Sequence, residues 1–241
     1  MQAINIALAL MGAYLIGSLS FAVIVSRVMG LADPREYGSK NPGATNVLRS
    51  GNKAAALLTL AFDALKGYVP VLLVLVYGPR FGLFENVAAF AGLAAFVGHL
   101  WPVFFRFQGG KGVATAGGVL LAINPLLGAA TLLTWAIIAA FFRYSSLASI
   151  VAAVFAPFYQ ALIWGVEPAI LAIIGMSLLL VWRHQGNISK LLAGKETKLG
   201  QKAEAAAVHH VDKPHTRHGH ATKHTGHAAP SQPHKHRSPK K

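Results

Sequence analysis

Seven long apolar runs, separated by short polar or glycine-rich segments, dominate this sequence. The first extends from Ala3 to Val28, and about 20 apolar residues are enough to cross the ~30 Å hydrocarbon core of a bilayer. The others cover residues 54–77, 83–105, 112–123, 125–142, 146–164 and 168–182. The pattern predicts an all-α integral membrane protein, a bundle of about seven transmembrane helices. Because the fourth run is short and a tight turn at Asn124-Pro125 follows it, five or six spans with a re-entrant piece are the alternative.

The composition agrees with a membrane protein and narrows its chemistry. Hydrophobic residues make up 54% of the chain and charged residues 12%, a balance that a soluble domain would rarely expose to water. The chain has no cysteine, which excludes disulfides, thiolate catalysis and zinc sites with sulfur ligands. Its eight acidic residues are mostly scattered singly, so we predict no metal and no cofactor.

The positions of Lys and Arg predict the orientation, because these residues collect in cytoplasmic loops. One set of alternate loops holds four of them within residues 29–53, others within 106–111, Arg143, and everything after Arg183. The opposite set holds only Arg80. We therefore expect the N-terminus outside and the C-terminus in the cytoplasm, with every polar, glycine-rich loop on the cytoplasmic face.

The last 41 residues differ from the rest of the chain. Residues 201–241 hold eight Lys or Arg, two acidic residues and nine of the eleven histidines, with almost no large apolar side chain that could form a core. The sequence predicts a membrane-embedded domain over residues 1–200 and a disordered, basic, histidine-rich cytoplasmic tail over 201–241. A solvated tail is the simpler interpretation, and weak attraction to anionic lipid, nucleic acid or metal is the other. We expect no specific nucleic-acid partner.

The segment Gln108–Gly118 is rich in glycine and carries one lysine, Lys111. Glycines let backbone amides converge on an anion, and the lysine adds a positive charge beside a helix that should begin near Gly112. The segment therefore predicts a phosphate site. It is not a Walker loop, because Gly112 follows the lysine where Ser or Thr would be needed. Close helix packing is the alternative explanation for the glycines.

The first cytoplasmic loop contains the polar stretch Gly38–Arg49. Ser39 and Asn46 can supply hydrogen bonds, and Arg49 can bind a phosphate through two parallel N–H groups. The alternative is structural: residues 41–43 form an ordinary turn, Thr45 or Asn46 caps the next helix and Arg49 anchors the protein at the membrane surface.

The last apolar run ends in Arg183-His184-Gln185-Gly186-Asn187. His184 and Asn187 are three residues apart and would share one side of a helical turn, so His184 could orient a hydroxyl nucleophile while Asn187 holds its neighbour. Membrane anchoring is the alternative for Arg183 and His184.

Other polar residues in the apolar runs have simpler explanations. His99 fits a role in orienting a loop by one hydrogen bond. Asp63 and Lys66 can pair within one helix, and such a pair is costly in a membrane, although we favour a structural role. Ser146 and Ser149 could cap the sixth helix or contact a ligand.

Taken together, these stretches resemble the family of bacterial membrane glycerol-3-phosphate acyltransferases that use acyl phosphate as donor. The resemblance covers about residues 3–198 and rests on residues 38–49, 98–118 and 183–187 with the region of Glu196, in the order of that family. Lys40 stands where the family usually has a small residue, often glycine.

The resemblance implies transfer of a fatty acyl group from acyl phosphate to the 1-hydroxyl of sn-glycerol-3-phosphate, giving lysophosphatidic acid and phosphate in the inner membrane, as the first acylation of phospholipid synthesis. The peripheral enzyme that makes acyl phosphate would be a partner, beside membrane lipid. The residues implied for the glycerol-3-phosphate pocket are Ser39, Asn46, Arg49, Lys111, His184 and Asn187, with Ser146 and Ser149 as weaker members, and those shared with acyl phosphate are Lys111 and the amides of Gly109, Gly110 and Gly112.

Two other functions compete with acyl transfer. A transporter of phosphorylated or anionic solutes would also have glycine loops and broken helices, but would carry more polar residues through the midplane than Asp63 and Lys66. A scaffold would act through the tail. Neither His99 nor His184 has an aspartate five residues later, which disfavours the acyl-CoA class of glycerolipid acyltransferases.

Overall fold

The computed structural model describes residues 1–201, which lie within one compact unit and contain helices and no strand. This confirms the all-α prediction. Except for Gln201, the predicted tail over 201–241 lies outside the described residues. The α-helices are α1 (Gln2–Gly17), α2 (Phe21–Val28), α3 (Ala44–Leu48), α4 (Lys53–Tyr77), α5 (Glu85–Leu100), α6 (Val113–Ile123), α7 (Pro125–Phe142), α8 (Ser145–Trp164), α9 (Ala169–Arg183) and α10 (Gln185–Leu192), and the 3-10 turns are η1 (Gly78–Phe81) and η2 (Val103–Phe105).

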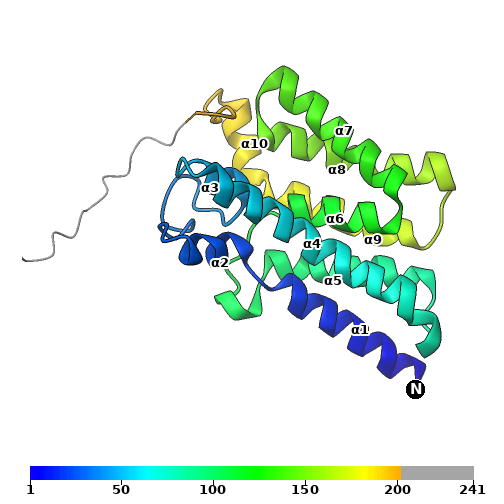
Figure 1. Cartoon of the computed structure of the whole chain (residues 1–241). Helices are drawn as coiled ribbons and strands as arrows, with labels where there is room; N and C mark the ends of the chain where they lie inside the picture. Colours follow the sequence, from blue (N-terminus) through cyan, green and yellow to red (C-terminus); the bar gives the residue numbers. More distant parts are fainter. Residues whose placement is uncertain (202–241) are drawn as a thin grey trace, which may run out of the picture. The chain divides into compact units, whose positions relative to one another are not determined.

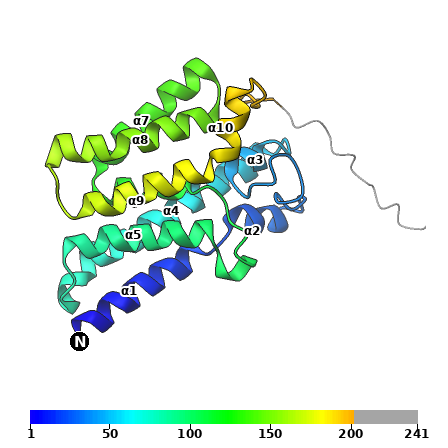
Figure 2. The ribbon, with the colours of Figure 1, turned by 180° about the vertical axis from the view of Figure 1, so that it is seen from behind.

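The long helices run side by side, and the short helix α6 lies among them (Figure 1). It packs mainly on α4 and also on α5 and α7, while α1 packs on α5 and α8 packs on α7 and α9. The short helices α2, α3 and α10 lie at one end of the bundle, and the view from behind shows the same arrangement (Figure 2). The polar loops identified in the sequence therefore lie at this end of the bundle, which we call the polar end.

The predicted number of membrane spans is only partly supported. Four helical segments are long and apolar enough to cross a bilayer, at Lys53–Phe81, Glu85–Phe105, Pro125–Phe142 and Ser145–Trp164. Two bent pairs, α1 with α2 at 41° and α9 with α10 at 55°, raise the number to six if each pair is one span. The helix α6 has 11 residues and is only ~16 Å long at 1.5 Å per residue, about half of a hydrocarbon core. The fourth apolar run is thus a buried helix too short to span alone.

Close approach of α4 and α6 depends on glycine. A Cβ placed on Gly118 would lie 1.9 Å from the carbonyl oxygen of Ala64, and one on Gly67 would lie 2.2 Å from that of Thr115. Both distances are far below contact, so only glycine permits this crossing. Glycine on both helices therefore fixes α6, and with it the loop that precedes α6, against α4.

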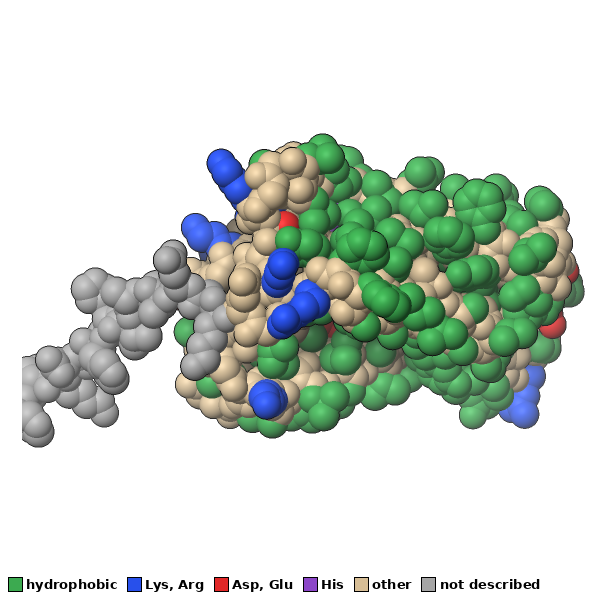
Figure 3. All heavy atoms as spheres, turned by 90° about the horizontal axis from the view of Figure 1, so that it is seen from above, with side chains coloured by type: hydrophobic (Ala, Val, Ile, Leu, Met, Phe, Trp, Pro, Cys, Tyr) green, Lys and Arg blue, Asp and Glu red, His purple; other side chains and the backbone are tan. Residues whose placement is uncertain are grey.

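The outer surface between the two ends is apolar. Phe141, Leu162 and Leu171 are all more than 60% exposed in the isolated chain. Hydrophobic side chains cover the middle of the face in Figure 3, whereas Lys and Arg side chains lie toward the ends. Since a contiguous apolar surface of this extent is not tolerated in water, it faces lipid, and the protein is a multi-pass membrane protein.

Candidate functional site

A chain of polar contacts links the glycine-rich loop before α6, the segment around α10 and the first turn of α8 at the polar end of the bundle. The Lys111 ammonium donates a hydrogen bond to Oδ1 of Asn187. The Asn187 amide Nδ2 donates to Oε1 of Glu196 over 2.6 Å, and the Ser146 hydroxyl donates to the same oxygen over 2.7 Å. Asn187 is therefore fixed with its oxygen toward the cation and its nitrogen toward the carboxylate.

The segment that carries Glu196 follows α10 and is attached to the turn between α7 and α8. The N–H of Leu199 donates to the carbonyl oxygen of Arg143 over 2.6 Å. Because Ser146 lies in the first turn of α8, this contact and the Ser146–Glu196 hydrogen bond join the segment to the same turn. Lys111 and Glu196 are more than 80 positions apart in the sequence, and these contacts bring them into one polar cluster.

Lys111 is half-buried, and its surroundings make it easier to deprotonate. Burial lowers its pKa to about 8, with further lowering from Lys190, Arg49 and Arg183, while the Glu196 carboxylate opposes the shift. The ammonium is thus only partly compensated by the protein. A bound anion would supply the missing charge and raise this pKa again.

The glycine loop is held by Arg183, at the end of α9. Its guanidinium donates to the carbonyl oxygen of Gly109 over 2.9 Å, and to that of Gly110 over 3.0 and 3.2 Å. In a planar trans peptide the next N–H points the opposite way, so the N–H groups of Gly110 and Lys111 face away from Arg183. The Gly110 N–H meets the carbonyl oxygen of His99 at 3.2 Å. The N–H groups of Gly109, Lys111 and Gly112 have no acceptor within residues 1–201.

The turn that enters this loop is strained. Arg106 and Phe107 have φ values of 55° and 59°, two consecutive non-glycine residues in the left-handed region. Gly112, at φ 81°, is the N-cap of α6, and a Cβ there would lie 2.2 Å from the Phe96 ring. The loop conformation is therefore specified by its own residues and by the helix beneath it, which is the condition for a preorganised anion site.

His184 lies at the bend between α9 and α10 and is 2% exposed. Its Nδ1 lies 2.8 Å from the carbonyl oxygen of Leu180, and since a carbonyl only accepts, Nδ1 carries the proton. The neutral ring thus keeps a lone pair on Nε2, as a proton acceptor requires. Asn187 is one turn onward, and its N–H donates to the His184 carbonyl oxygen over 2.8 Å.

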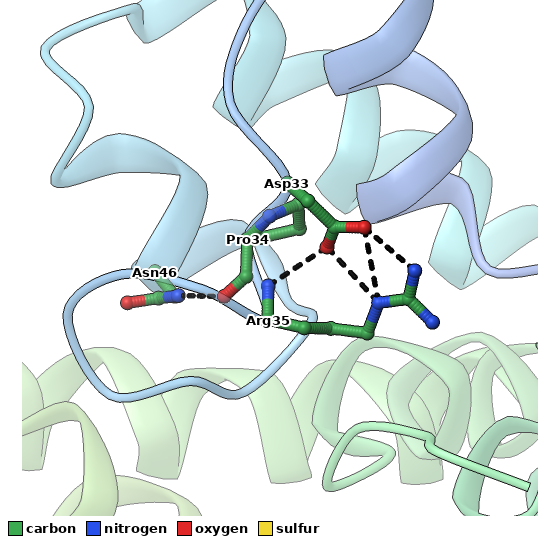
Figure 4. Close-up of polar contacts among 4 residues, drawn as sticks. All are labelled: Asp33, Pro34, Arg35 and Asn46. Carbon is green, nitrogen blue, oxygen red and sulfur yellow. Dashed lines mark hydrogen bonds and ion pairs between the residues drawn. The ribbon is translucent and has the colours of Figure 1, made fainter. Parts of the chain in front are cut away.

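Asn46 organises the first loop. It is 2% exposed; its Nδ2 donates to the carbonyl oxygens of Pro34 at 2.7 Å and Tyr37 at 3.1 Å, and its Oδ1 accepts from the Ser39 N–H at 2.9 Å. Figure 4 shows the contact with Pro34, beside the ion pair of Asp33 and Arg35. The Asn46 side chain is therefore used within the loop and makes no hydrogen bond to the Lys111 cluster within residues 1–201, and its contact with substrate stays a prediction.

Ser39 and Lys40 occupy the exposed part of this loop. Lys40 has φ 55°, in the left-handed region that favours glycine, which is consistent with the small residue that the resemblance leads us to expect there. The carbonyl oxygen of Pro42 would lie 2.7 Å from a Cβ on Gly110, so the first loop touches the glycine loop. Arg49 is half-buried and close enough to act on the charge of Lys111.

Ser149 is a second predicted residue that lies apart from the cluster. Its hydroxyl donates to the carbonyl oxygen of Ser145 over 2.8 Å and accepts from Trp135 Nε1 over 3.1 Å. These contacts fasten α7 to α8, so the side chain has a packing role. Of the two serines named for α8, only Ser146 joins the polar cluster.

Sequence reasoning missed the roles of two residues. Arg183 has the pattern of a membrane anchor, yet it fastens the glycine loop, and no spacing rule connects it to a loop more than 70 residues earlier. Glu196 entered only through the resemblance, although it is the acceptor that joins Ser146 to Asn187. A carboxylate placed among several cations was the available signal. No cluster of metal ligands occurs in the described part of the chain.

A half-buried ammonium beside free backbone amides can bind a phosphate. A neutral imidazole with a free ring nitrogen can receive a proton from a hydroxyl. Comparison with known proteins identifies the family. Residues 7–194 match the model of a family described as glycerol-3-phosphate acyltransferase. The chain belongs to this family.

Relatives and solved structures extend the match over most of the chain. A glycerol-3-phosphate acyltransferase of Paraburkholderia phytofirmans is 65% identical over 196 residues, covering 81% of this chain and 92% of the relative, and one of Burkholderia orbicola is 64% identical over 206 residues, covering 84% and 97%. The crystal structure of PlsY (YgiH), an integral membrane glycerol 3-phosphate acyltransferase, in its glycerol 3-phosphate form has a TM-score of 0.76 at 38% identity, covering 81% of this chain and 96% of that one. Its lysophosphatidic acid form gives 0.74 at 37% identity, covering 80% and 95%.

Proposed function

We propose that the protein transfers a fatty acyl group from acyl phosphate to the 1-hydroxyl of sn-glycerol-3-phosphate, releasing lysophosphatidic acid and phosphate. This is the first acylation of phospholipid synthesis. The observation that carries the proposal is the Lys111–Asn187 contact beside the Arg183-held glycine loop, because it places a partly uncompensated cation and free amides where a phosphate can bind. The names of the relatives support the same acceptor.

The reaction needs no covalent enzyme intermediate. The glycerol hydroxyl attacks the acyl carbon, the bond from that carbon to the phosphate oxygen breaks, and phosphate leaves with the electron pair. The hydroxyl proton goes to Nε2 of His184 or to the departing phosphate. Lys111 and the loop amides stabilise the charge on the phosphate, where preorganised donors contribute most to the rate. Arg49 and Ser39 complete the pocket for the acceptor.

The site faces the cytoplasm of the inner membrane in this proposal, with the N-terminus outside, because Lys and Arg concentrate in the loops at the site's end of the bundle. The donor would then come from the peripheral enzyme that makes acyl phosphate. Single cysteines at Gly82 and Gly194 test the orientation, since the natural chain has none. In intact cells an impermeant thiol reagent should label Gly82→Cys and leave Gly194→Cys unlabelled; the reverse pattern would refute the orientation.

The activity is tested by release of inorganic phosphate from palmitoyl phosphate, with and without glycerol-3-phosphate. We expect release only with the acceptor, formation of lysophosphatidic acid in equal amount, and loss of both in His184→Ala if His184 takes the proton. Activity in His184→Ala would assign the proton to the donor phosphate. An acyl group trapped on the protein without acceptor would refute direct transfer. Uptake of the acceptor into vesicles without acylation would favour a transporter.

A further inference from the structure

A buried acid lies directly beneath the glycine loop. Asp63, on α4, is 2% exposed, and its Oδ1 lies 2.8 Å from Nζ of Lys66 and 3.7 Å from Nδ1 of His99. Lys66 is 3% exposed and also donates to the carbonyl oxygen of Leu19 over 2.6 Å. Although Oδ1 is paired with Lys66, it accepts no well-aligned hydrogen bond within residues 1–201. The oxygen therefore has capacity to accept a hydrogen bond from another group, and His99 lies within ion-pair distance of it.

The imidazole of His99 connects this acid to the loop. Its Nδ1 also lies 3.2 Å from the Thr115 hydroxyl, in the first turn of α6. The 3.7 Å between Nδ1 and Asp63 is an ion-pair distance, longer than a hydrogen bond, and the Thr115 hydroxyl can donate or accept. A carboxylate favours the tautomer with the proton on Nδ1, and in that tautomer the lone pair of the neutral ring is on Nε2. A Cβ placed on Gly110 would lie 2.3 Å from Nε2, which puts the ring edge directly against the backbone of Gly110.

His99 also holds the same loop residue through its backbone, because its carbonyl oxygen accepts the Gly110 N–H at 3.2 Å. Gly110 is thus held from below by His99 and from the side by Arg183. Since the next N–H in the chain belongs to Lys111, a shift of the ring would tilt the peptide that presents Lys111 to an anion.

We propose that Asp63 and His99 are positioning residues for the phosphate loop: Asp63 fixes the tautomer and rotation of the His99 ring, and the ring edge sets the position of Gly110. Lys66 compensates the buried carboxylate. This inference rests on the proposed function only in that the loop binds phosphate. It differs from a purely structural ion pair, which would matter for folding but not for ligand affinity.

The decisive variant is Asp63→Asn/Lys66→Gln, which removes both charges together and leaves no lone charge in the membrane. Thr59→Val is the matched control, because Thr59 lies one turn earlier on α4, is fully buried and has a hydroxyl without a partner among the described residues. Each full-length protein is measured in detergent for its melting temperature, for the shift produced by inorganic phosphate or glycerol-3-phosphate, and for KM and kcat.

We expect the double variant to melt near the wild type, to lose most of the phosphate-induced shift, and to show KM for glycerol-3-phosphate raised about tenfold with kcat changed much less. Thr59→Val should match the wild type in all of these. Wild-type KM and a wild-type phosphate shift in the double variant would overturn the proposal, because the pair would then only stabilise the fold.

His99 is tested by two substitutions that separate its nitrogens. His99→Gln can place a polar atom near the position of Nε2, whereas His99→Asn can replace only Nδ1, so KM should rise more in His99→Asn. Equal KM in the two folded variants would refute a role for the ring edge, and this comparison decides even if the double variant does not fold. Without wild-type acyl transfer the proposed function fails, but the phosphate shift still tests the positioning; no phosphate shift in the wild type would overturn both.

Discussion

At the polar end of the helical bundle the connecting segments are bonded to one another, whereas at the opposite end the connections are separate turns. The polar end joins separate segments through Lys111 with Asn187 and through Arg183 with the glycine loop. At the other end, the side chains of Gln2 and Asn5 donate to the carbonyl oxygens of Gly82 and Phe81, both at 2.9 Å, and simply hold a turn. Polar groups at the site's end therefore keep binding capacity for a ligand, whereas those of Gln2 and Asn5 at the other end are satisfied within the fold.

The largest expected difference between the ends comes from removing one cation at each. Lys111→Ala should lower kcat/KM for acyl transfer by about 10²-fold or more, the usual effect of deleting a preorganised donor to a developing charge. Arg80→Ala at the opposite end should change it less than about twofold, because the Arg80 guanidinium lies over the Tyr77 ring, at 5.8 Å, away from the Lys111 cluster. Steady-state kinetics on both variants give the comparison, and similar losses in the two would show that the site is not confined to the polar end.

The second expected difference between the two ends comes from changing the geometry of a cation while keeping its charge. Arg183→Lys keeps the cation but cannot bind two carbonyl oxygens with a planar fork, so the glycine loop should lose its fixed orientation. We expect kcat/KM to fall about 30-fold, an effect of the size that loss of positioning can produce. Arg80→Lys is the same exchange at the opposite end and should have no measurable effect. Wild-type kinetics in Arg183→Lys would mean that the loop orients itself.

The sequence predicted the helical class and the positions of the apolar runs because membrane helices depend on composition, which is local. It predicted Lys111, Asn187 and Ser146 as site residues, and the structure brings these into one cluster. It did not predict that Asn46 is used within its own loop, or that Ser149 binds Trp135.

The contacts of Asn46 and Ser149 depend on which way each side chain points after distant segments pack. The periodicity of a sequence carries no such information. The length of α6 was the other uncertainty. The run was visible, but its role as a short buried helix depends on the close crossing with α4 at Gly67 and Gly118.

The third expected effect is a pH dependence of KM at the polar end. Because burial lowers the Lys111 pKa to about 8, the ammonium is present below that pH and lost above it. Phosphate binds the protonated form, so KM for glycerol-3-phosphate should rise about tenfold between about pH 7 and pH 9. Removing the opposing carboxylate in Glu196→Gln should move the midpoint to lower pH. Lys111→Arg, which stays protonated, should abolish the rise, and a rise that persists in Lys111→Arg would assign the titration to another group.

The smallest expected effect on KM comes from removing a helix cap at each end of the bundle. Asn124, in the turn between α6 and α7, accepts from the Leu126 N–H at 2.8 Å, and Asn52, at the polar end, accepts from the Ala55 N–H at 3.0 Å. Replacing either by Ala should cost about 1 kcal/mol of stability, seen as a lower melting temperature in detergent. Asn124→Ala should leave KM unchanged, because no site residue lies in its turn. Asn52→Ala should raise KM slightly, since it loosens the start of α4 just after Arg49. Equal KM values in the two variants would show that the first loop holds Arg49 without help from this cap, and would place the boundary of the site before Asn52.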